Sequence, residues 1–483
     1  MNREAIASWL KNPFNLILIL ILIIAFLFQV YYFSATKSQA LWWDESEYML
    51  KAKSIAFGLP DTGYWAGRPI LFPVILSGFF FLGFSEIAIR FFLILISLGT
   101  VYLVFAIGKK LFDDKTAIVA SFLFSFFYIF LFYSFRIMVD IMSLFLGLLA
   151  FYFFLKKGKY LWFSIPLFVI ATFLRFPLFW LFIVLFIYIL FTEEKWSKNK
   201  NYWISAALGI IISLPFLIWS YFKYGNPLYS ILIGGGGALA TPEGGRFGVF
   251  MQYINYLPHY AGYLILILFV IGFLYTLLFL LGLDLLKKDE KLKRDFLIFL
   301  WIIIPLIYFG FFVNHFEDRY LFMIFPVFFM LVSVTLFKIS NILNKYYKYL
   351  GIIFIVLFLL YSANNMNAQA SSIITAQATS YSEIKDVGLW IKDNSQKGDS
   401  IISAAVPALT YYSEKAVYSH EQNLSAELNQ IKDKKVKYIV ITNLEKAPDW
   451  VVPFFSSNQT LFKPAYQSYT QARGTFAVVF STE

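Results

Sequence analysis

The stretch that decides the fold lies near the start of the chain and reads FNLILILILIIAFLFQVYYF from Phe14 to Phe33. It contains no charged residue, and it has the length of about 20 mostly apolar residues that a helix needs to cross the core of a bilayer. The whole chain is similar, since 60% of its 483 residues are hydrophobic and only 14% are charged. An ordinary soluble domain has about 25% charged residues. The composition therefore excludes a single soluble enzyme, a disordered chain and a fibrous protein.

The sequence predicts a polytopic α-helical membrane protein with about 11 transmembrane helices. The apolar segment 69–84 is not counted among them, because it contains two prolines and two glycines, and irregular backbone exposed to lipid is excluded from the hydrocarbon core. We expect an interfacial or re-entrant segment there. The predicted spans are 14–33, 86–108, 116–135, 141–155, 160–174, 177–191, 202–221, 261–286, 296–313, 321–339 and 349–362.

The positions of lysine and arginine predict the orientation of these spans. Cytoplasmic loops of membrane proteins carry an excess of both residues. With the N-terminus in the cytoplasm, the basic clusters at 109–110, 156–159, 195–200 and 287–294 all fall on that side. The net charge of +11 follows from this topology and gives no argument for nucleic acid as a partner. We expect a multi-pass protein of the plasma membrane.

The composition becomes polar and mixed from residue 363 onward. An odd number of spans precedes this part, so it is expected to be a small extracytoplasmic α/β domain. The predicted domains are thus a transmembrane domain, 1–362, with a first outer loop at 34–85, and the C-terminal domain, 363–483. The elements expected in the C-terminal domain are an amphipathic helix at 381–395 and buried strands at 400–405, 436–442 and 476–480.

Unusual charged groups gather at the predicted outer ends of the spans. Ionisable groups at membrane depth are costly, so their placement is a clue to function. Acids and arginines from separate loops can meet at one surface of the outer leaflet. They are Asp44, Glu45 and Arg68 in the first outer loop, Arg136 and Asp140 in the second, Arg175 at the third, and His315 and Arg319 in the fifth.

This set suits the transfer of a group from a phosphate carrier. Asp44 and Asp140 can serve as a general base and as an aligning or metal-holding carboxylate. The guanidinium groups of Arg68, Arg175 and Arg319 match the geometry of a phosphate. The arginines alone can neutralise a leaving phosphate, so the sequence does not decide whether the site also binds a divalent metal ion. The candidate metal ligands are Asp44, Glu45, Asp140 and His315.

Simpler interpretations fit some of the same residues. Asp44 and Glu45 also suit a solvated interfacial helix, and arginines at the membrane edge often extend their heads into water. A transporter or lipid flippase is the alternative from another class, but such proteins place ionisable groups near the midplane and often contain repeated halves. The ionisable residue well within a predicted span is Arg90, near an outer end. A membrane-anchored binding module would not require eleven spans.

These motifs resemble the polyprenyl-phosphate-dependent glycosyltransferases of the C superfamily, in the branch of the protein O-mannosyltransferases and the lipid A aminoarabinose transferase. In that branch an Asp-Glu pair in the first outer loop contains the catalytic base. Arg68 stands where the family often has lysine, and Gly67 where the aminoarabinose branch has an acid, so the sugar of that branch is not implied. The matching motifs are Trp43-Asp44-Glu45, Arg68-Pro69, Arg136 with Asp140, and Arg319-Tyr320-Leu321 with Pro326.

The resemblance implies an inverting glycosyltransferase that moves a monosaccharide from a polyprenyl-phosphate carrier to a hydroxyl of a protein, glycan or lipid at the outer membrane face. It implies Asp44 as general base, assisted by Glu45 or Asp140. The residues expected on the donor phosphate are Arg68 and Arg319, with Arg175 and Arg136 as further candidates. The candidates for contact with the sugar or acceptor are Tyr64, Trp65, His259, Tyr260 and His315.

The predicted outer loop 223–260 is long and rich in glycine, and it contains three prolines, so it is not expected to form one regular helix. We expect the glycine run 234–237 to be flexible and the loop to order over the site when donor binds, which would shield the sugar from water. The alternative is a linker that does not contact substrate.

Overall fold

Contacts between residues divide the chain into two compact units. The helical unit comprises residues 1–33 and 91–374, and the mixed unit comprises residues 34–90 and 375–483. The computed structural model describes the chain over residues 9, 11–238, 245–458 and 460–482.

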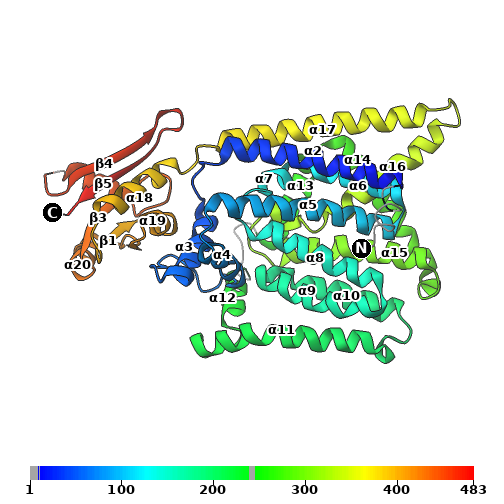
Figure 1. The fold of residues 1–483 in the computed structure, drawn as a ribbon, viewed down its shortest axis with the longest axis horizontal. Coiled ribbons are helices and arrows are strands. Elements are labelled where there is room, and N and C mark those ends of the chain that lie inside the picture. The colour runs from blue at the N-terminus through cyan, green and yellow to red at the C-terminus, as the bar shows by residue number, and fades with distance from the viewer. Residues whose placement is uncertain (1–8, 10, 239–244, 459, 483) are drawn as a thin grey trace. The chain divides into compact units, whose positions relative to one another are not determined.

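The predicted polytopic helical fold is confirmed. Each of the eleven predicted spans falls on helix, and eight helices of the described residues are long and apolar enough to cross a membrane. Figure 1 shows α5, α8 and α11 extended in nearly the same direction. The eight helices are α2 (Pro13–Thr36), α5 (Glu86–Leu111), α8 (Val139–Lys156), α11 (Lys200–Tyr224), α14 (Tyr263–Thr276) with the 3-10 turns that follow it, α15 (Glu290–Phe311), α16 (Phe325–Leu343) and α17 (Leu350–Gln377).

The other three predicted spans form shorter helices. The span at 116–135 is broken at Phe127, whose extended ψ of 118° ends one helix before the next begins. The shorter helices pack within the bundle: α6 against α16, α9 against both α8 and α11, and α10 against α15. They are α6 (Asp114–Phe126), α7 (Tyr128–Tyr133), α9 (Leu161–Leu174) and α10 (Trp180–Thr192).

The segment 223–260 is more helical than the sequence predicts. It contains α12 (Tyr229–Ala238) and most of α13 (Gly245–Ala261). The expectation that the glycines at 234–237 form a flexible loop is wrong, because all four belong to α12. Residues 239–244 lie outside the described part of the chain.

The C-terminal part of the mixed unit is built on a five-stranded sheet of order β2-β1-β3-β5-β4. Strand β1 pairs in parallel with β2 and β3, whereas β5 pairs antiparallel with β3 and β4. The predicted strands correspond to β1, β3 and β5, whereas β2 and the edge strand β4 were not predicted. The strands are β1 (Ser400–Ser403), β2 (Ala416–Tyr418), β3 (Val436–Thr442), β4 (Lys463–Thr470) and β5 (Thr475–Ser481).

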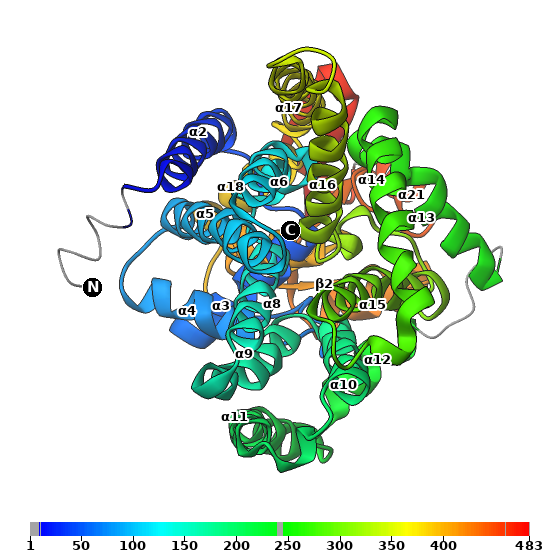
Figure 2. The ribbon, with the colours of Figure 1, turned by 90° about the vertical axis from the view of Figure 1, so that its right-hand side faces the viewer.

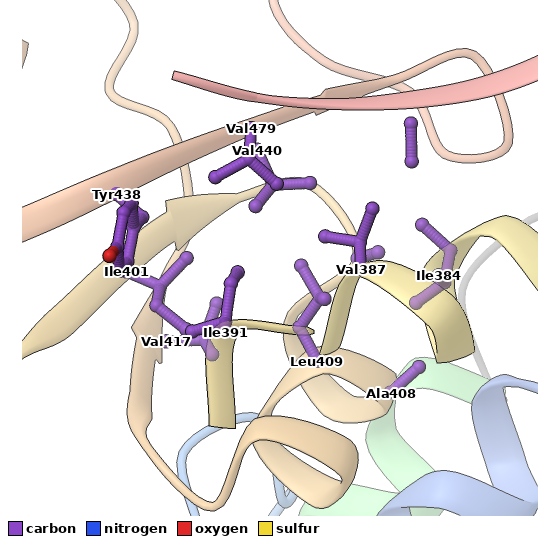
Figure 3. Packing of buried hydrophobic residues seen from close by; sticks show 12 residues of the cluster. Ile384, Val387, Ile391, Ile401, Ala408, Leu409, Val417, Tyr438, Val440 and Val479 are labelled. Carbon is purple, nitrogen blue, oxygen red and sulfur yellow. The ribbon is translucent and has the colours of Figure 1, made fainter. Parts of the chain in front are cut away.

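Helices cover both faces of this sheet. On one face, α18 (Ser382–Asn394) and α19 (Val406–Ser413) pack against Ile401 and its neighbours, as Figure 3 shows. On the other face, α21 (Val451–Ser457) packs against Ile402. Successive side chains of a strand point to opposite faces, so the pair Ile401-Ile402 contributes to both cores.

The segment 34–90 packs against the C-terminal part within the mixed unit. Its helix α3 (Trp43–Phe57) contacts both α4 (Leu71–Phe81) and α19. The backbone N–H of Leu41 donates to the hydroxyl of Tyr412 at 2.8 Å, and Lys53 Nζ lies 2.8 Å from Glu414 Oε1. The predicted boundary at residue 362 divides the chain differently, since it assigns this segment to the transmembrane domain.

We expect Tyr412→Phe to destabilise the mixed unit. The substitution leaves the buried N–H of Leu41 without its acceptor, at a cost of about 1–3 kcal/mol. A lower thermal midpoint of the purified protein would show this. The control is Tyr469→Phe, because Tyr469 is exposed. Equal midpoints for the two variants would contradict the prediction.

Candidate functional site

Glu45 caps the N-terminus of helix α3. Trp42 is the residue before the first turn of the helix, and its backbone N–H donates to Glu45 Oε2 at 3.0 Å. Such a capping interaction satisfies a backbone donor that helix geometry leaves without a partner. Glu45 is fully buried. This placement argues against the catalytic role predicted for Glu45.

The opposite side of the same turn carries an acidic face that contacts Arg68. Asp44, Glu47 and Tyr48 are three and four residues apart and therefore share one side of the helix. Arg68 Nη2 donates to Asp44 Oδ1 at 2.5 Å and Nη1 donates to the Tyr48 hydroxyl at 3.3 Å. Arg68 Nε forms an ion pair with Glu47. One guanidinium thus connects three side chains of the first helical turns.

The two acids on this face differ in their access to solvent. The side chain of Asp44 is 22% exposed, whereas that of Glu47 is 5% exposed. Burial raises the pKa of Glu47 from 4.5 to about 7, although the nearby charge of Arg68 lowers it. Asp44 is therefore the acid that an incoming molecule can reach, and Glu47 is a buried neighbour that titrates near neutral pH.

Sequence reasoning missed Glu47. Its Oε1 accepts a hydrogen bond from the indole N–H of Trp43 at 2.9 Å, which fixes the carboxylate beside Arg68. The signal was its position three residues after Asp44, because that spacing places both carboxylates on one helix face. Glu45, one residue after Asp44, points to a different side.

The turn that presents Arg68 includes Tyr64 and Trp65. The Tyr64 hydroxyl donates to the backbone carbonyls of Arg68 and Pro69, each at 3.3 Å. The Trp65 ring lies over Gly67, where a Cβ atom would come within 2.6 Å of it. Glycine thus allows the ring to fold back onto the chain. Trp65 is 47% exposed, so its role in contact with a sugar or acceptor stays a prediction.

In the helical unit, the predicted residues Asp140, Arg175 and Arg319 come together. Asp140 lies in the first turn of α8 and its side chain is 1% exposed. It forms an ion pair with Arg175, and its Oδ2 lies 3.6 Å from Arg319 Nη1. A carboxylate enclosed in this way acts as the counter-ion of two guanidinium groups, which argues against Asp140 as a proton acceptor.

The loop that carries Arg319 holds a second acid in place. Arg319 Nε donates to Glu317 Oε2 at 2.5 Å. Burial raises the pKa of Glu317, but hydrogen bonds from His315 and Arg319 and the charges of Arg319 and Arg175 outweigh burial and lower the pKa to about 2. The guanidinium of Arg175 lies 4.9 Å from the ring centre of Tyr320. The guanidinium of Arg319 lies 5.9 Å from the ring centre of Tyr133, so both arginines are fixed by charge and by aromatic contact.

The other predicted residues of the helical unit take different positions. His315 Nε2 lies 2.7 Å from the Tyr320 hydroxyl, and Arg136 is buried with its guanidinium 5.3 Å from the Phe132 ring centre. His259 is exposed at the end of α13. The expectation that Tyr260 stacks on a sugar is wrong for this structure: the ring is fully buried, and its hydroxyl donates to the Asp318 carbonyl at 2.9 Å.

The described residues contain no group of three or more His, Asp or Glu side chains that would hold a metal ion. Two of the four predicted ligands are engaged elsewhere, Glu45 by the helix cap and His315 by Tyr320. The donor set therefore does not fit a metal site within either unit.

Comparison with known proteins supports a class of membrane glycosyltransferase. Residues 67–219 match the family of dolichyl-phosphate-mannose-protein mannosyltransferases. A search of curated protein sequences finds no match. The matched segment contains Arg68, Asp140 and Arg175 but neither Asp44 nor Arg319.

Solved structures share the fold of almost the whole chain. One is the archaeal oligosaccharyltransferase AglB from Archaeoglobus fulgidus, in complex with an inhibitory peptide and a dolichol-phosphate: identity is 13% and the TM-score is 0.63, over 95% of this chain and 74% of that one. Another is ArnT from Cupriavidus metallidurans bound to undecaprenyl phosphate, with 11% identity and a TM-score of 0.61 over 95% and 97% of the two chains.

The fold and the family match confirm the resemblance found in the sequence. One of these solved structures holds a dolichol-phosphate and the other holds undecaprenyl phosphate. Together with the matched segment they indicate that this chain is a glycosyltransferase embedded in a membrane.

Proposed function

We propose that the protein is an inverting glycosyltransferase that transfers a monosaccharide from a polyprenyl-phosphate carrier to a hydroxyl acceptor at the extracytoplasmic membrane face. The observation that carries the proposal is the pair formed by Asp44 and Arg68. Asp44 is a partly exposed carboxylate, oriented by a guanidinium that also binds the same helix through Glu47 and Tyr48. A fixed and accessible carboxylate is what general-base catalysis requires.

In the proposed reaction the acceptor oxygen attacks the anomeric carbon from the face opposite the phosphate. The hydroxyl proton passes to Asp44 as the new carbon–oxygen bond forms. The bond between the anomeric carbon and the phosphate oxygen breaks, its electron pair leaves with the polyprenyl phosphate, and the configuration inverts. Positive groups fixed in advance stabilise the charge that develops on the leaving phosphate.

Arginine is well suited to this last task, because each guanidinium has five N–H donors. Arg68 uses some of these donors on Asp44, Glu47 and Tyr48, and we propose that the rest bind the carrier phosphate. Arg175, Arg319 and Arg136 remain further candidates for phosphate. The dolichol-phosphate and undecaprenyl phosphate bound to the related structures support a polyprenyl phosphate as the carrier here.

The test is turnover by the purified protein in vesicles that contain polyprenyl-phosphate-linked mannose as donor. We expect acceptor-dependent release of polyprenyl phosphate and a product of inverted anomeric configuration, with both rates strongly reduced in Asp44→Asn. A related donor with another sugar is the next probe if mannose is not transferred. Movement of intact donor between leaflets, without release of phosphate from any donor, would support a flippase instead.

The raised pKa of Glu47 predicts a pH effect on this reaction. Below about pH 7 Glu47 is protonated and Arg68 pairs mainly with Asp44; above it, the charged Glu47 shares the guanidinium. Asp44 is then less neutralised and accepts a proton more readily. We therefore expect kcat to rise as the pH passes about 7, and we expect Glu47→Gln to remove this step from the pH profile.

Glu445→Gln is the matched control for this pH effect. Glu445 is another acid of the mixed unit with a raised pKa, owing to burial, and it accepts its hydrogen bond from Tyr381 and not from Arg68. Its variant is expected to keep the step near pH 7. A step that survives in Glu47→Gln would show that another group causes it.

A further inference from the structure

An apolar cavity lies among α8, α9, α10 and α11 of the helical unit. Its volume is about 290 Å³, and its lining is almost entirely hydrocarbon and aromatic. The walls include Leu161 and Ile165 from α9, Phe186 and Ile189 from α10, and Ala206 from α11. Water is a poor occupant of such a space, because a buried water needs two to four polar partners.

Helix α11 forms the outer wall of the cavity and contacts the bundle mainly through α9. Only 17% of its membrane-spanning window is buried, against 56% for α8. Figure 2 shows α11 at the edge of the bundle, beside α9. A gap of this kind inside a bilayer is open to the hydrocarbon chains of lipids.

Two tryptophans mark one end of the cavity. Trp196 and Trp203 line the cavity with their ring centres 6.2 Å apart. The indole N–H of Trp203 donates to the Ser197 carbonyl at 2.7 Å. Tryptophan prefers the level of the lipid headgroups, so this end of the cavity lies at the membrane–water interface.

The loops at the same end are basic. Residues 156–159 and 193–200 together contain six lysines and two glutamates, and one of these acids, Glu193, is already paired with Lys157 at 3.2 Å. Lys195, Lys198 and Lys200 are exposed next to the two tryptophans. The charge at the mouth of the cavity is therefore complementary to an anionic headgroup.

We propose that this cavity binds one acyl chain of an anionic phospholipid, whose headgroup phosphate contacts Lys195, Lys198 and Lys200. The site is distinct from the cluster of Asp140 and the arginines, because those residues lie at the opposite end of α8, which is about 27 Å long at 1.5 Å per residue. The lipid would fill the gap that α11 leaves and fix this helix to the bundle.

The experiment is native mass spectrometry of the full chain, delipidated in detergent and titrated with phosphatidylglycerol or with phosphatidylcholine. We expect one phosphatidylglycerol per protein to bind more tightly than phosphatidylcholine. Ala206→Phe, which fills the cavity, should weaken binding by about tenfold or more. The matched control is Ala207→Phe, because Ala207 is exposed on α11 and should retain the lipid.

A second pair of variants tests the headgroup. Changing Lys195, Lys198 and Lys200 to glutamine should abolish the preference for phosphatidylglycerol over phosphatidylcholine. The same change at Lys432, Lys434 and Lys435, exposed lysines of the mixed unit, should preserve it. Three results would each overturn the proposal. The first is equal lipid binding by Ala206→Phe and Ala207→Phe, and the second is a preference for phosphatidylglycerol that survives the change of Lys195, Lys198 and Lys200. The third is displacement of the phospholipid by polyprenyl phosphate.

Discussion

Replacing Asp44 with asparagine is expected to lower kcat by about 10²–10⁴-fold, the range for loss of a general base. Asparagine keeps the shape of the side chain and can still accept a hydrogen bond from Arg68, so the turn that holds the guanidinium should persist. What is lost is the negative charge that receives the proton of the acceptor hydroxyl. Binding of the polyprenyl-phosphate donor should change little.

Two measurements separate this loss of chemistry from a loss of structure. The rate of polyprenyl phosphate release at saturating donor reports on kcat, and a donor-binding assay reports on the phosphate site. The matched control is Asp61→Asn, which removes an acid of the same loop that pairs with Lys51 and is 43% exposed. Full activity in Asp44→Asn, or equal losses in the two variants, would remove Asp44 from the mechanism.

The membrane fold was predictable because the hydrophobic length of a span is a strong and local signal. All eleven predicted spans are helical. Helix ends were harder to predict where the apolar run is longer than the helix. At Phe127 the backbone leaves the helical conformation and divides one apolar run into α6 and α7. Strand β4 was missed because it is an edge strand with exposed, mostly polar side chains, so it lacks the apolar run used to find the others.

The charged residues of the candidate site could be predicted from the sequence, but the contacts that each of them makes could not. Charge placement identified Asp44, Arg68, Asp140, Arg175 and Arg319 as groups of interest. Distinguishing Glu45 from Glu47 required the helix start, because a shift of one residue decides which carboxylate caps the helix. Tyr260 is predicted to contact a sugar because it is an aromatic residue near the end of a predicted outer loop, whereas its burial follows from packing against Phe325, 65 residues later in the chain.

The largest effect on stability is expected from Asp140→Asn. This change removes a negative charge enclosed by Arg175 and Arg319, whose side chains are only 11% and 14% exposed. Breaking a buried ion pair by removing one partner costs about 3–5 kcal/mol, because the remaining charge stays desolvated and uncompensated. Glu317 can compensate only part of this loss, because this single carboxylate, which pairs with Arg319, would then face two guanidinium groups.

Asp295→Asn is the matched control, because it also removes a buried aspartate that pairs with an arginine. That arginine, Arg294, has a side chain that is 23% exposed and can turn toward water, so its charge need not stay buried. We expect a clearly lower thermal midpoint for Asp140→Asn than for Asp295→Asn. If Asp140 instead took part in proton transfer, the variant would lose activity at an unchanged midpoint, and Asp140→Glu would not restore it. A counter-ion role predicts the reverse: stability falls first, and glutamate, which keeps the charge, recovers part of it.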